Sequence, residues 1–334
     1  MSQKSLKSTN PGIIAGFAGN WCRLESVKRS QNTVSAALAR RKSQKVSKNS
    51  RNLRKNWGPN TMIFDAKSVL ERIRAESKEK VSKMRKKPKI LIVMSGDDEP
   101  SERYVRNKCL DFEKIGIEYK VKYVDTISKL LKTIDKANND EEITGIIVQR
   151  PVNLTDVMPG KRLEHGIANW ITPTKDIDGA REDSPYPTGC VRALDILLAE
   201  TGFEVSGKTA VVIGRGEVGI PIARRLLGLD STVTVAHSKT KPSDLMNLIY
   251  YADIVVGAAG LKTPVEINDV GGCLFIDYGI TKGEDGKLHG DLYVRNPENT
   301  NSIITSVPGG MGLLVRGALI ENIMDACDRF PWRY

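Results

Sequence analysis

The stretch "TAVVIGRGEVGIPIARRLL", residues 209–227, joins an apolar strand, a glycine turn and an amphipathic helix. Gly214, Gly216 and Gly219 have the GxGxxG spacing in which a strand leads into a helix whose first N–H groups face a pyrophosphate. A second apolar strand, 232–237, follows at the distance expected of a βαβ unit. The stretch therefore predicts a Rossmann-type lobe that binds a dinucleotide through these glycines.

The residues after the second strand indicate which dinucleotide is bound. NAD-preferring sites place Asp or Glu there to bind the ribose 2′-OH, but this chain continues with Ser238 and Lys239. Arg215 lies inside the glycine turn, and a guanidinium, a hydroxyl and an ammonium suit a 2′-phosphate. The sequence therefore favours NADP. The alternative is that Arg215 and Lys239 are solvated loop charges.

From Met62 onward, strands alternate with helices, a pattern typical of parallel βαβ units. The predicted helices cover 65–86, 101–115, 127–138, 188–201, the helix of the glycine motif and 311–328. The predicted strands cover 89–95, 118–125, 144–149, 209–214, 232–237, 253–259 and 273–279. The fold class predicted is α/β with two lobes joined near residue 190.

The composition excludes several classes of protein. No apolar run approaches the roughly 20 residues that span a bilayer, so a membrane protein is not expected. The five cysteines form no CxxC pair and the three histidines form no HExxH motif. Neither a disulfide framework nor a metal site is therefore expected.

The net charge of +11 is confined to one end of the chain. Residues 1–61 contain 13 Lys and Arg but one acidic residue, Glu25, whereas 62–334 contain 38 basic and 39 acidic residues. No nucleic-acid partner is therefore expected for the folded part. The leading interpretation of 1–61 is a basic, disordered tail. An organelle transit peptide, a nucleic-acid-binding arm and translation from Met62 are the alternatives.

Four polar side chains of the first lobe are candidates for a substrate site. Tyr104 and Lys108 lie at i and i+4 of a predicted helix and share one face. Gln149 lies at the carboxyl end of a predicted strand, where α/β sites gather, and Asp178 lies in a turn before Gly179. Taken singly, each also has a structural explanation, as a surface pair, a capping amide or a turn former.

Together, these motifs resemble the bifunctional methylenetetrahydrofolate dehydrogenase/cyclohydrolase family of the FolD type, from Met62 to about Ala326. The resemblance is carried by "YVRNK", "GIIVQRP", "KDIDG", "VVIGRG", "TVTVAHSKT" and "VPGGMG". It implies a folate-binding catalytic domain (62–187), a Rossmann NADP-binding domain (188–310) and a C-terminal helix (311–334) that packs back on the first domain. It also implies a homodimer and a cytoplasmic location, unless 1–61 targets an organelle.

The resemblance also implies individual roles. Lys108 matches the catalytic lysine, Tyr104 the tyrosine that stacks on folate, Gln149 the glutamine that holds the lysine, and Asp178 the aspartate that binds the pterin. The positions that match NADP contacts are Gly214, Arg215, Gly216, Gly219, Ser238 and Ile280. The positions that match the loop lining the folate pocket are Pro308, Gly309 and Gly310.

The implied reaction is NADP-dependent oxidation of 5,10-methylenetetrahydrofolate to the 5,10-methenyl form, followed by hydrolysis to 10-formyltetrahydrofolate. The chain departs from the family at the glycine turn, which is one residue shorter and has Gly216 in place of Ser, and at Arg150, which replaces a common Leu. A dehydrogenase-only member and a catalytically silent NADP-binding paralogue are therefore the alternatives.

Overall fold

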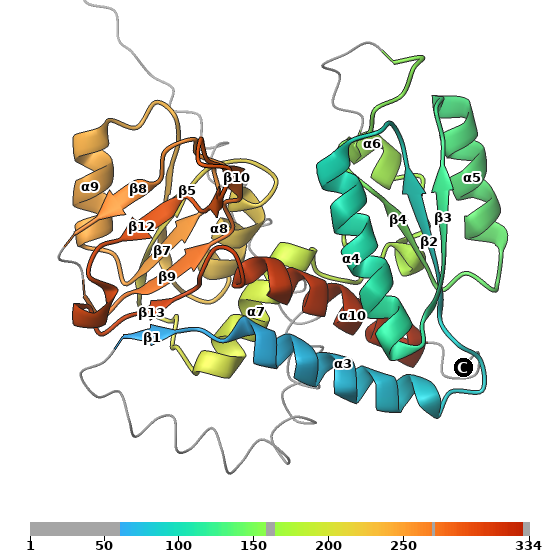
Figure 1. The fold of residues 1–334 in the computed structure, drawn as a ribbon, viewed down its shortest axis with the longest axis horizontal. Coiled ribbons are helices and arrows are strands. Elements are labelled where there is room, and N and C mark those ends of the chain that lie inside the picture. The colour runs from blue at the N-terminus through green and yellow to red at the C-terminus, as the bar shows by residue number, and fades with distance from the viewer. Residues whose placement is uncertain (1–60, 158–163, 269–270, 330–334) are drawn as a thin grey trace, which may run out of the picture. The chain divides into compact units, whose positions relative to one another are not determined.

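The computed structural model describes residues 61–157, 164–268 and 271–329. The predicted tail therefore lies outside the described residues except for Thr61. Within these ranges the predicted α/β fold with two lobes is confirmed (Figure 1). In the same ranges, no helix combines the length and apolar character needed to cross a membrane.

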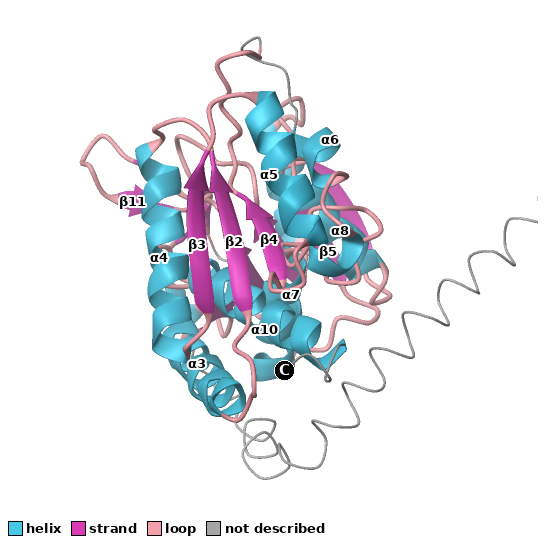
Figure 2. Ribbon diagram, turned by 90° about the vertical axis from the view of Figure 1, so that its right-hand side faces the viewer, coloured by secondary structure: helices cyan, strands magenta, loops and turns pink. Residues whose placement is uncertain are grey.

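The first lobe is built on a three-stranded parallel sheet, which Figure 2 shows in the order β3–β2–β4. Alternate residues of β2 face opposite sides: Ile90 and Ile92 pack with helix α4, whereas Leu91 and Val93 pack with helix α5. The elements of this lobe are α3 (Ala66–Ser82), β2 (Lys89–Met94), α4 (Glu99–Ile115), β3 (Glu118–Tyr123), α5 (Ile127–Asn139), β4 (Gly145–Val148), α6 (Glu164–Ala168) and η1 (Pro173–Lys175).

The second lobe contains a six-stranded parallel sheet in the order β1–β13–β9–β7–β5–β6, in which β1 is Met62–Ile63. Its main elements are β5 (Thr209–Ile213), α8 (Gly219–Leu227), β6 (Thr232–Ala236), α9 (Pro242–Tyr250), β7 (Ile254–Gly257), β9 (Leu274–Asp277) and β13 (Ile303–Ile304). Two small two-stranded sheets and a 3₁₀ turn complete it: β8 (Val265–Ile267) with β12 (Leu292–Val294), β10 (Thr281–Lys282) with β11 (Leu288–His289), and η2 (Pro297–Asn299).

Helices α7 (Gly189–Thr201) and α10 (Met311–Arg329) connect the lobes. Helix α10 leaves the second lobe after β13 and packs along both α3 and α7 (Figure 1). Its buried residues, among them Leu314, Ala318 and Ile323, belong to the same apolar core as Leu70 and Ile73 of α3. The C-terminal helix therefore returns to the first lobe, as the fold prediction stated.

The structure adds elements that the sequence pattern does not predict. Strand β1 (Met62–Ile63) pairs in parallel with β13, so these two residues extend the sheet of the second lobe. Strands of two or three residues are too short to show a period, and their partners lie far away in sequence. The sequence pattern also does not predict helix α9.

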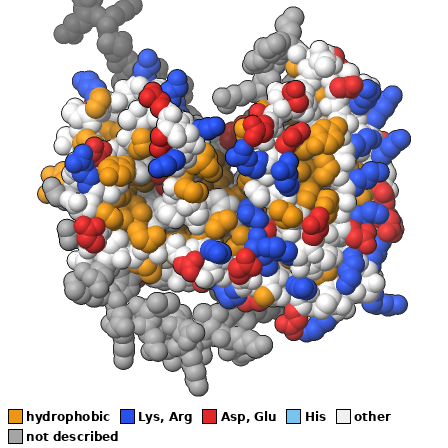
Figure 3. Space-filling view, in the orientation of Figure 1, with side chains coloured by type: hydrophobic (Ala, Val, Ile, Leu, Met, Phe, Trp, Pro, Cys, Tyr) orange, Lys and Arg blue, Asp and Glu red, His pale blue; other side chains and the backbone are white. Residues whose placement is uncertain are grey.

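Charged side chains are interspersed on the face of the molecule seen in Figure 3, where Lys and Arg alternate with Asp and Glu. This surface matches the near-neutral balance of residues 62–334 in the sequence.

Candidate active site

Helix α4 presents Tyr104 and Lys108 toward Gln149 and Asp178. The ammonium of Lys108, a residue 4% exposed, donates to Gln149 Oε1 at 3.3 Å. Lys108 Nζ also lies 4.0 Å from Asp178 Oδ1 and 4.9 Å from the centre of the Tyr104 ring. Four side chains from three segments of the chain therefore meet at one buried cation.

The helix that carries this pair has defined ends. The Asp98 carboxylate caps its start by accepting from the Ser101 N–H at 2.9 Å. Gly116, with φ of +89°, ends it by donating its N–H to Phe112 O. These caps fix which residues are helical and thereby keep Tyr104 and Lys108 one turn apart on one face.

Gln149 is held by its neighbours so that its side-chain oxygen faces the lysine. Its backbone N–H continues the β2–β4 ladder by donating to Val93 O at 2.9 Å. Its side-chain Nε2 donates to Arg150 O at 2.9 Å, which directs Oε1 toward Lys108. Because the amide is neutral, it holds the ammonium without adding a charge.

Two residues that the sequence does not single out, Lys175 and Asp176, fix the segment around Asp178. Asp176 is fully buried and accepts from the N–H groups of Ala180 and Arg181. Burial raises the pKa of Asp176, and these two hydrogen bonds lower it in part. The Lys175 ammonium caps the end of α5 by donating to three carbonyl oxygens, those of Ala137, Asn138 and Asp140.

A glycine is required directly after Asp178. Gly179 has φ of +66°, and a Cβ on it would lie 2.5 Å from Pro187 O. Any side chain here would push the loop away from residue 187. The glycine of "KDIDG" therefore allows the loop to close tightly beside Asp178.

Tyr104 is half-buried, and this burial raises the pKa of its phenol. The negative charge of Asp178 raises it further. The phenol is therefore neutral at physiological pH and offers a ring face and one O–H group to a ligand.

The glycine turn of the second lobe is too crowded for side chains at two of its three glycines. Gly214 has φ of +119°, and its Cβ would lie 2.2 Å from Ala258 O. A Cβ on Gly219 would lie 2.1 Å from Gly214 O, whereas one on Gly216 would meet nothing within 4 Å. Helix α8 begins at Gly219 without a side-chain cap. Ile220 already donates its N–H to Gly216 O, and Pro221 has no N–H. Of the first three residues of α8, Gly219 can therefore offer its N–H to a dinucleotide pyrophosphate.

The predicted 2′-phosphate ligands come from neighbouring segments. Gly214 N–H donates to Ala236 O at 2.9 Å, which places the turn beside the end of β6, two residues before Ser238. Both Arg215 and Ser238 are exposed. The structure therefore brings their segments together and leaves both side chains accessible.

Ile280 lies next to the start of helix α10. It is 60% exposed, and a Cβ on Gly312 would lie 3.9 Å from its Cδ1. Pro308 and Gly309 are exposed and Gly310 is buried in the loop that leads into α10. The predicted nicotinamide contact is thus next to the segment predicted to line the folate pocket.

Two buried aspartates, Asp277 and Asp291, hold the loops of the second lobe but are not candidates from the sequence. Asp291, 0% exposed, accepts from the N–H groups of three residues after β7, Ala259, Gly260 and Leu261. Asp277 accepts from the N–H groups of Gly279, Asp291 and Leu292. Burial raises the pKa of Asp277 to about 6 despite these hydrogen bonds. The pair orders the loops after β7 and β9, and its only sequence signal is an Asp within two residues of a glycine in "FIDYG" and "HGD".

Arg150 joins the two lobes. Its guanidinium pairs with Glu217 of the glycine turn, with 2.8 Å between Nη1 and Oε2. Arg150 also lines a small pocket that includes Asp178 and apolar side chains of β4 and the loop after α6. A residue adjacent to Gln149 thus contacts the predicted cofactor turn.

Family models match both parts of this arrangement. Residues 64–178 match the catalytic domain of tetrahydrofolate dehydrogenase/cyclohydrolase, and residues 187–330 match its NAD(P)-binding domain. The four clustered side chains fall in the first match and the glycine turn in the second.

Relatives match over most of their length. The bifunctional protein FolD of Lactococcus lactis is 36% identical over 287 residues, which cover 80% of this chain and 97% of the relative. The crystal structure of Campylobacter jejuni FolD methylenetetrahydrofolate dehydrogenase/cyclohydrolase superposes with a TM-score of 0.72 at 29% identity, over 80% of this chain and 99% of that one. The Trypanosoma brucei enzyme, solved with NADP cofactor and inhibitor, gives 0.70 at 28% identity, over 81% and 99%. The chain belongs to the tetrahydrofolate dehydrogenase/cyclohydrolase family.

Proposed function

We propose that this chain is an NADP-dependent methylenetetrahydrofolate dehydrogenase and methenyltetrahydrofolate cyclohydrolase. It oxidises 5,10-methylenetetrahydrofolate to the 5,10-methenyl form and hydrolyses that to 10-formyltetrahydrofolate, two steps of one-carbon folate interconversion. The observation that carries the proposal is the convergence of Gln149, Asp178 and Tyr104 on Lys108.

In the folate half of the site, Asp178 and Tyr104 are proposed to bind the folate. The Asp178 side chain is 36% exposed and can accept hydrogen bonds from the N–H groups of a pterin. The half-buried ring of Tyr104 can stack on the folate. The loop of Pro308, Gly309 and Gly310 is proposed to close the pocket.

In the oxidation step, the methenyl product is a cation stabilised by its own nitrogens, so the protein contributes position more than proton transfer. NADP supplies the hydride acceptor when bound. Gly214, Gly216 and Gly219 are proposed to hold its pyrophosphate, Arg215 and Ser238 its 2′-phosphate, and Ile280 its nicotinamide end.

In the hydrolysis step, water adds to the methenyl carbon and the bond from that carbon to N5 breaks, which leaves the formyl group on N10. One proton of the water goes to N5 and the other is released to solvent. Lys108 is the group in the cluster that can relay the proton to N5 as a general acid/base. Gln149 keeps the ammonium in place through a neutral hydrogen bond, and Asp178 lies close enough to interact with it electrostatically.

The chain is proposed to have four parts: a basic tail (1–61), a catalytic domain (62–187), an NADP-binding domain (188–310) and the C-terminal helix (311–334). We further propose a homodimer, which sedimentation would reveal as twice the chain mass of 36.9 kDa. The proposed location is cytoplasmic. Import into an organelle is the alternative, which fractionation of cells expressing the tagged full chain distinguishes.

The test is an assay of the purified full chain with methylenetetrahydrofolate and either NADP or NAD. Absorbance gained from reduced cofactor and from methenyltetrahydrofolate is expected with NADP, and no gain with either cofactor would refute the proposal. Methenyl product that is hydrolysed no faster than in buffer would identify a dehydrogenase-only member. NADP binding without turnover would identify a silent paralogue.

The role of Lys108 is tested by Lys108→Ala, with Lys114→Ala as the matched control on the exposed side of α4. Lys108→Ala is expected to abolish hydrolysis of methenyltetrahydrofolate, while Lys114→Ala keeps it. Unchanged hydrolysis in Lys108→Ala would show that the lysine has another role.

A further inference from the structure

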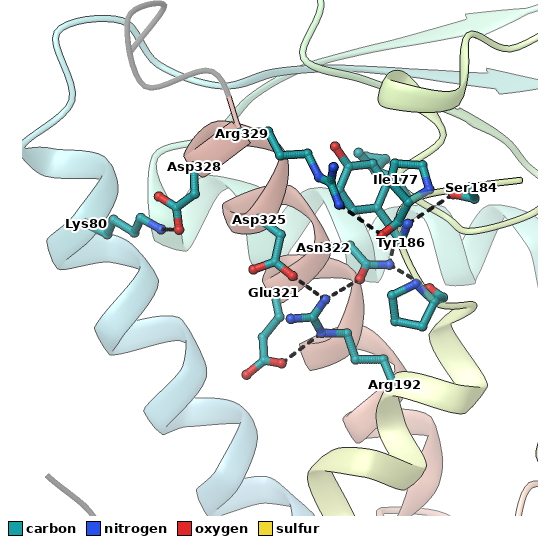
Figure 4. Close-up of polar contacts among 12 residues, drawn as sticks. Lys80, Ile177, Ser184, Tyr186, Arg192, Glu321, Asn322, Asp325, Asp328 and Arg329 are labelled. Atoms are coloured by element: carbon teal, nitrogen blue, oxygen red, sulfur yellow. Dashed lines mark hydrogen bonds and ion pairs between the residues drawn. The ribbon is translucent and has the colours of Figure 1, made fainter. Parts of the chain in front are cut away.

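We infer that Asn322 of helix α10 is a positioning residue for Asp178. Asn322 is a candidate neither for the folate site nor for the NADP site, and Figure 4 shows it between Arg192 and Ile177. The inference rests on the proposed function, because it assigns a consequence to the orientation of Asp178 in folate binding.

Both N–H groups and the oxygen of the Asn322 side-chain amide have hydrogen-bond partners. It is 0% exposed, and its Nδ2 donates to Ile177 O at 2.8 Å and to Pro187 O at 3.0 Å. Its Oδ1 accepts from Arg192 Nη1 at 2.8 Å. One buried amide therefore bridges two carbonyls of the Asp178 loop and one cation of α7.

Arg192 determines which way this amide faces. Its Nε donates to Glu321 Oε2 at 2.9 Å and its Nη1 to Asp325 Oδ2 at 2.6 Å (Figure 4). These two carboxylates of α10 fix the position of the guanidinium. A guanidinium has donors only, so it requires the oxygen of Asn322. The NH₂ group must then face Ile177 and Pro187.

The two carbonyls lie near the ends of a loop that has no secondary structure of its own. Between η1 and α7, residues 176–188 form neither a helix nor a strand, so tertiary contacts determine their path. The Ile177 carbonyl belongs to the peptide that joins Ile177 to Asp178. A rotation of that peptide changes the direction of the Asp178 side chain and its 4.0 Å approach to Lys108 Nζ.

A second contact from α10 supports the same loop. The guanidinium of Arg329 lies over the ring of Tyr186 at 5.4 Å (Figure 4). Tyr186 Oη donates to Thr174 O at 3.1 Å. Helix α10 thus holds the loop at both Tyr186 and Ile177. Asn322 is the member of this group that acts on the peptide next to the proposed folate ligand.

The experiment compares Asn322→Asp with Asp328→Asn in the full chain. Asn322→Asp keeps the shape of the side chain but places a second oxygen against the two carbonyls, so the loop must move. We expect the KM for methylenetetrahydrofolate to rise about tenfold or more, since a misaligned hydrogen bond to a charged group costs at least that much, with the KM for NADP within about twofold. Asp328→Asn changes an exposed carboxylate of the same helix that pairs with Lys80 of α3, and both KM values should stay within about twofold.

A double-mutant cycle separates positioning from a general structural effect. If Asn322 acts through Asp178, then Asn322→Asp adds little to the folate KM of Asp178→Asn, whereas independent effects would multiply. Asn322→Ser serves as a second variant without the amide, and thermal unfolding of each variant is measured alongside.

An unchanged folate KM in either folded variant would overturn the inference. Multiplicative effects in the cycle, or failure of both variants to fold, would also do so, because Asn322 would then act on the whole fold. Inactivity of the unmodified chain would instead refute the proposed function, so the two failures are distinguishable.

Discussion

The Asp111 carboxylate joins three helices, and its replacement by Asn gives a prediction that the structure quantifies. Asp111 lies on α4, one turn after Lys108, and is 1% exposed. It accepts from Arg316 Nε and Nη2 of α10, both at 2.7 Å, and pairs with Arg74 Nη2 of α3. Both arginine side chains are also largely buried, at 10% and 15% exposure.

Asp111→Asn keeps the size of the side chain, so no cavity forms and the effect is electrostatic. It leaves two guanidiniums beside a neutral amide whose own N–H groups face them. Breaking a buried ion pair by removing one partner costs about 3–5 kcal/mol. An unfolding entropy of about 2.1 cal/mol/K per residue gives about 1.8 °C of Tm per kcal/mol for the roughly 260 described residues. The predicted loss of Tm is about 5–9 °C.

The assay is thermal and urea unfolding of the full chain, with Asp328→Asn as the control. Asp328 also pairs with a cation of α3, Lys80, but these side chains are 56% and 37% exposed, so this change should cost no more than about 1 kcal/mol. Equal effects of the two substitutions would refute the argument from burial. As a further check, Asp111→Leu combined with Arg74→Met and Arg316→Met should recover much of the loss, because no buried charge is then left unpaired.

Three further predictions concern the second lobe. Gly214→Ala should abolish cofactor binding and destabilise the chain, whereas Gly228→Ala at the end of α8, where a Cβ would meet its nearest atoms at 3.5 Å, should bind NADP normally in titration calorimetry; equal behaviour would contradict the packing argument. Arg215→Ala should raise the KM for NADP far more than that for NAD, and equal losses would count against a 2′-phosphate contact. Asp277 has a pKa raised to about 6 in the folded state, so folding takes up a proton below that pH. Relative to Asp277→Asn, the unfolding free energy of the unmodified chain should therefore rise by about 2 kcal/mol from pH 7 to pH 4, and a flat difference in urea unfolding would refute the assignment.

Residues 209–227 by themselves identify the second lobe as a Rossmann type, because the strand, turn and helix are consecutive in the chain. The structure accounts for glycine at 214 and 219, where a Cβ would meet Ala258 O and Gly214 O, whereas a Cβ on Gly216 would meet no protein atom within 4 Å. The alternation of strands and helices likewise determines the α/β class, since a period of two or of 3.6 residues is visible within one element. The sequence also named Lys108 and the three side chains that gather around it, through motifs that are each a few consecutive residues long.

Only the tertiary structure decided how those side chains are held. Asn322 lies 145 residues from Ile177, and Arg316 lies 205 residues from Asp111. The short strands β1 and β13 are equally remote, pairing Met62 with Ile303. No pattern within one element encodes such contacts, because the energy of a buried amide or carboxylate comes from partners that other segments bring to it. The sequence thus determined the elements and the reactive groups, and the packing of α10 on α3, α4 and α7 determined their orientation.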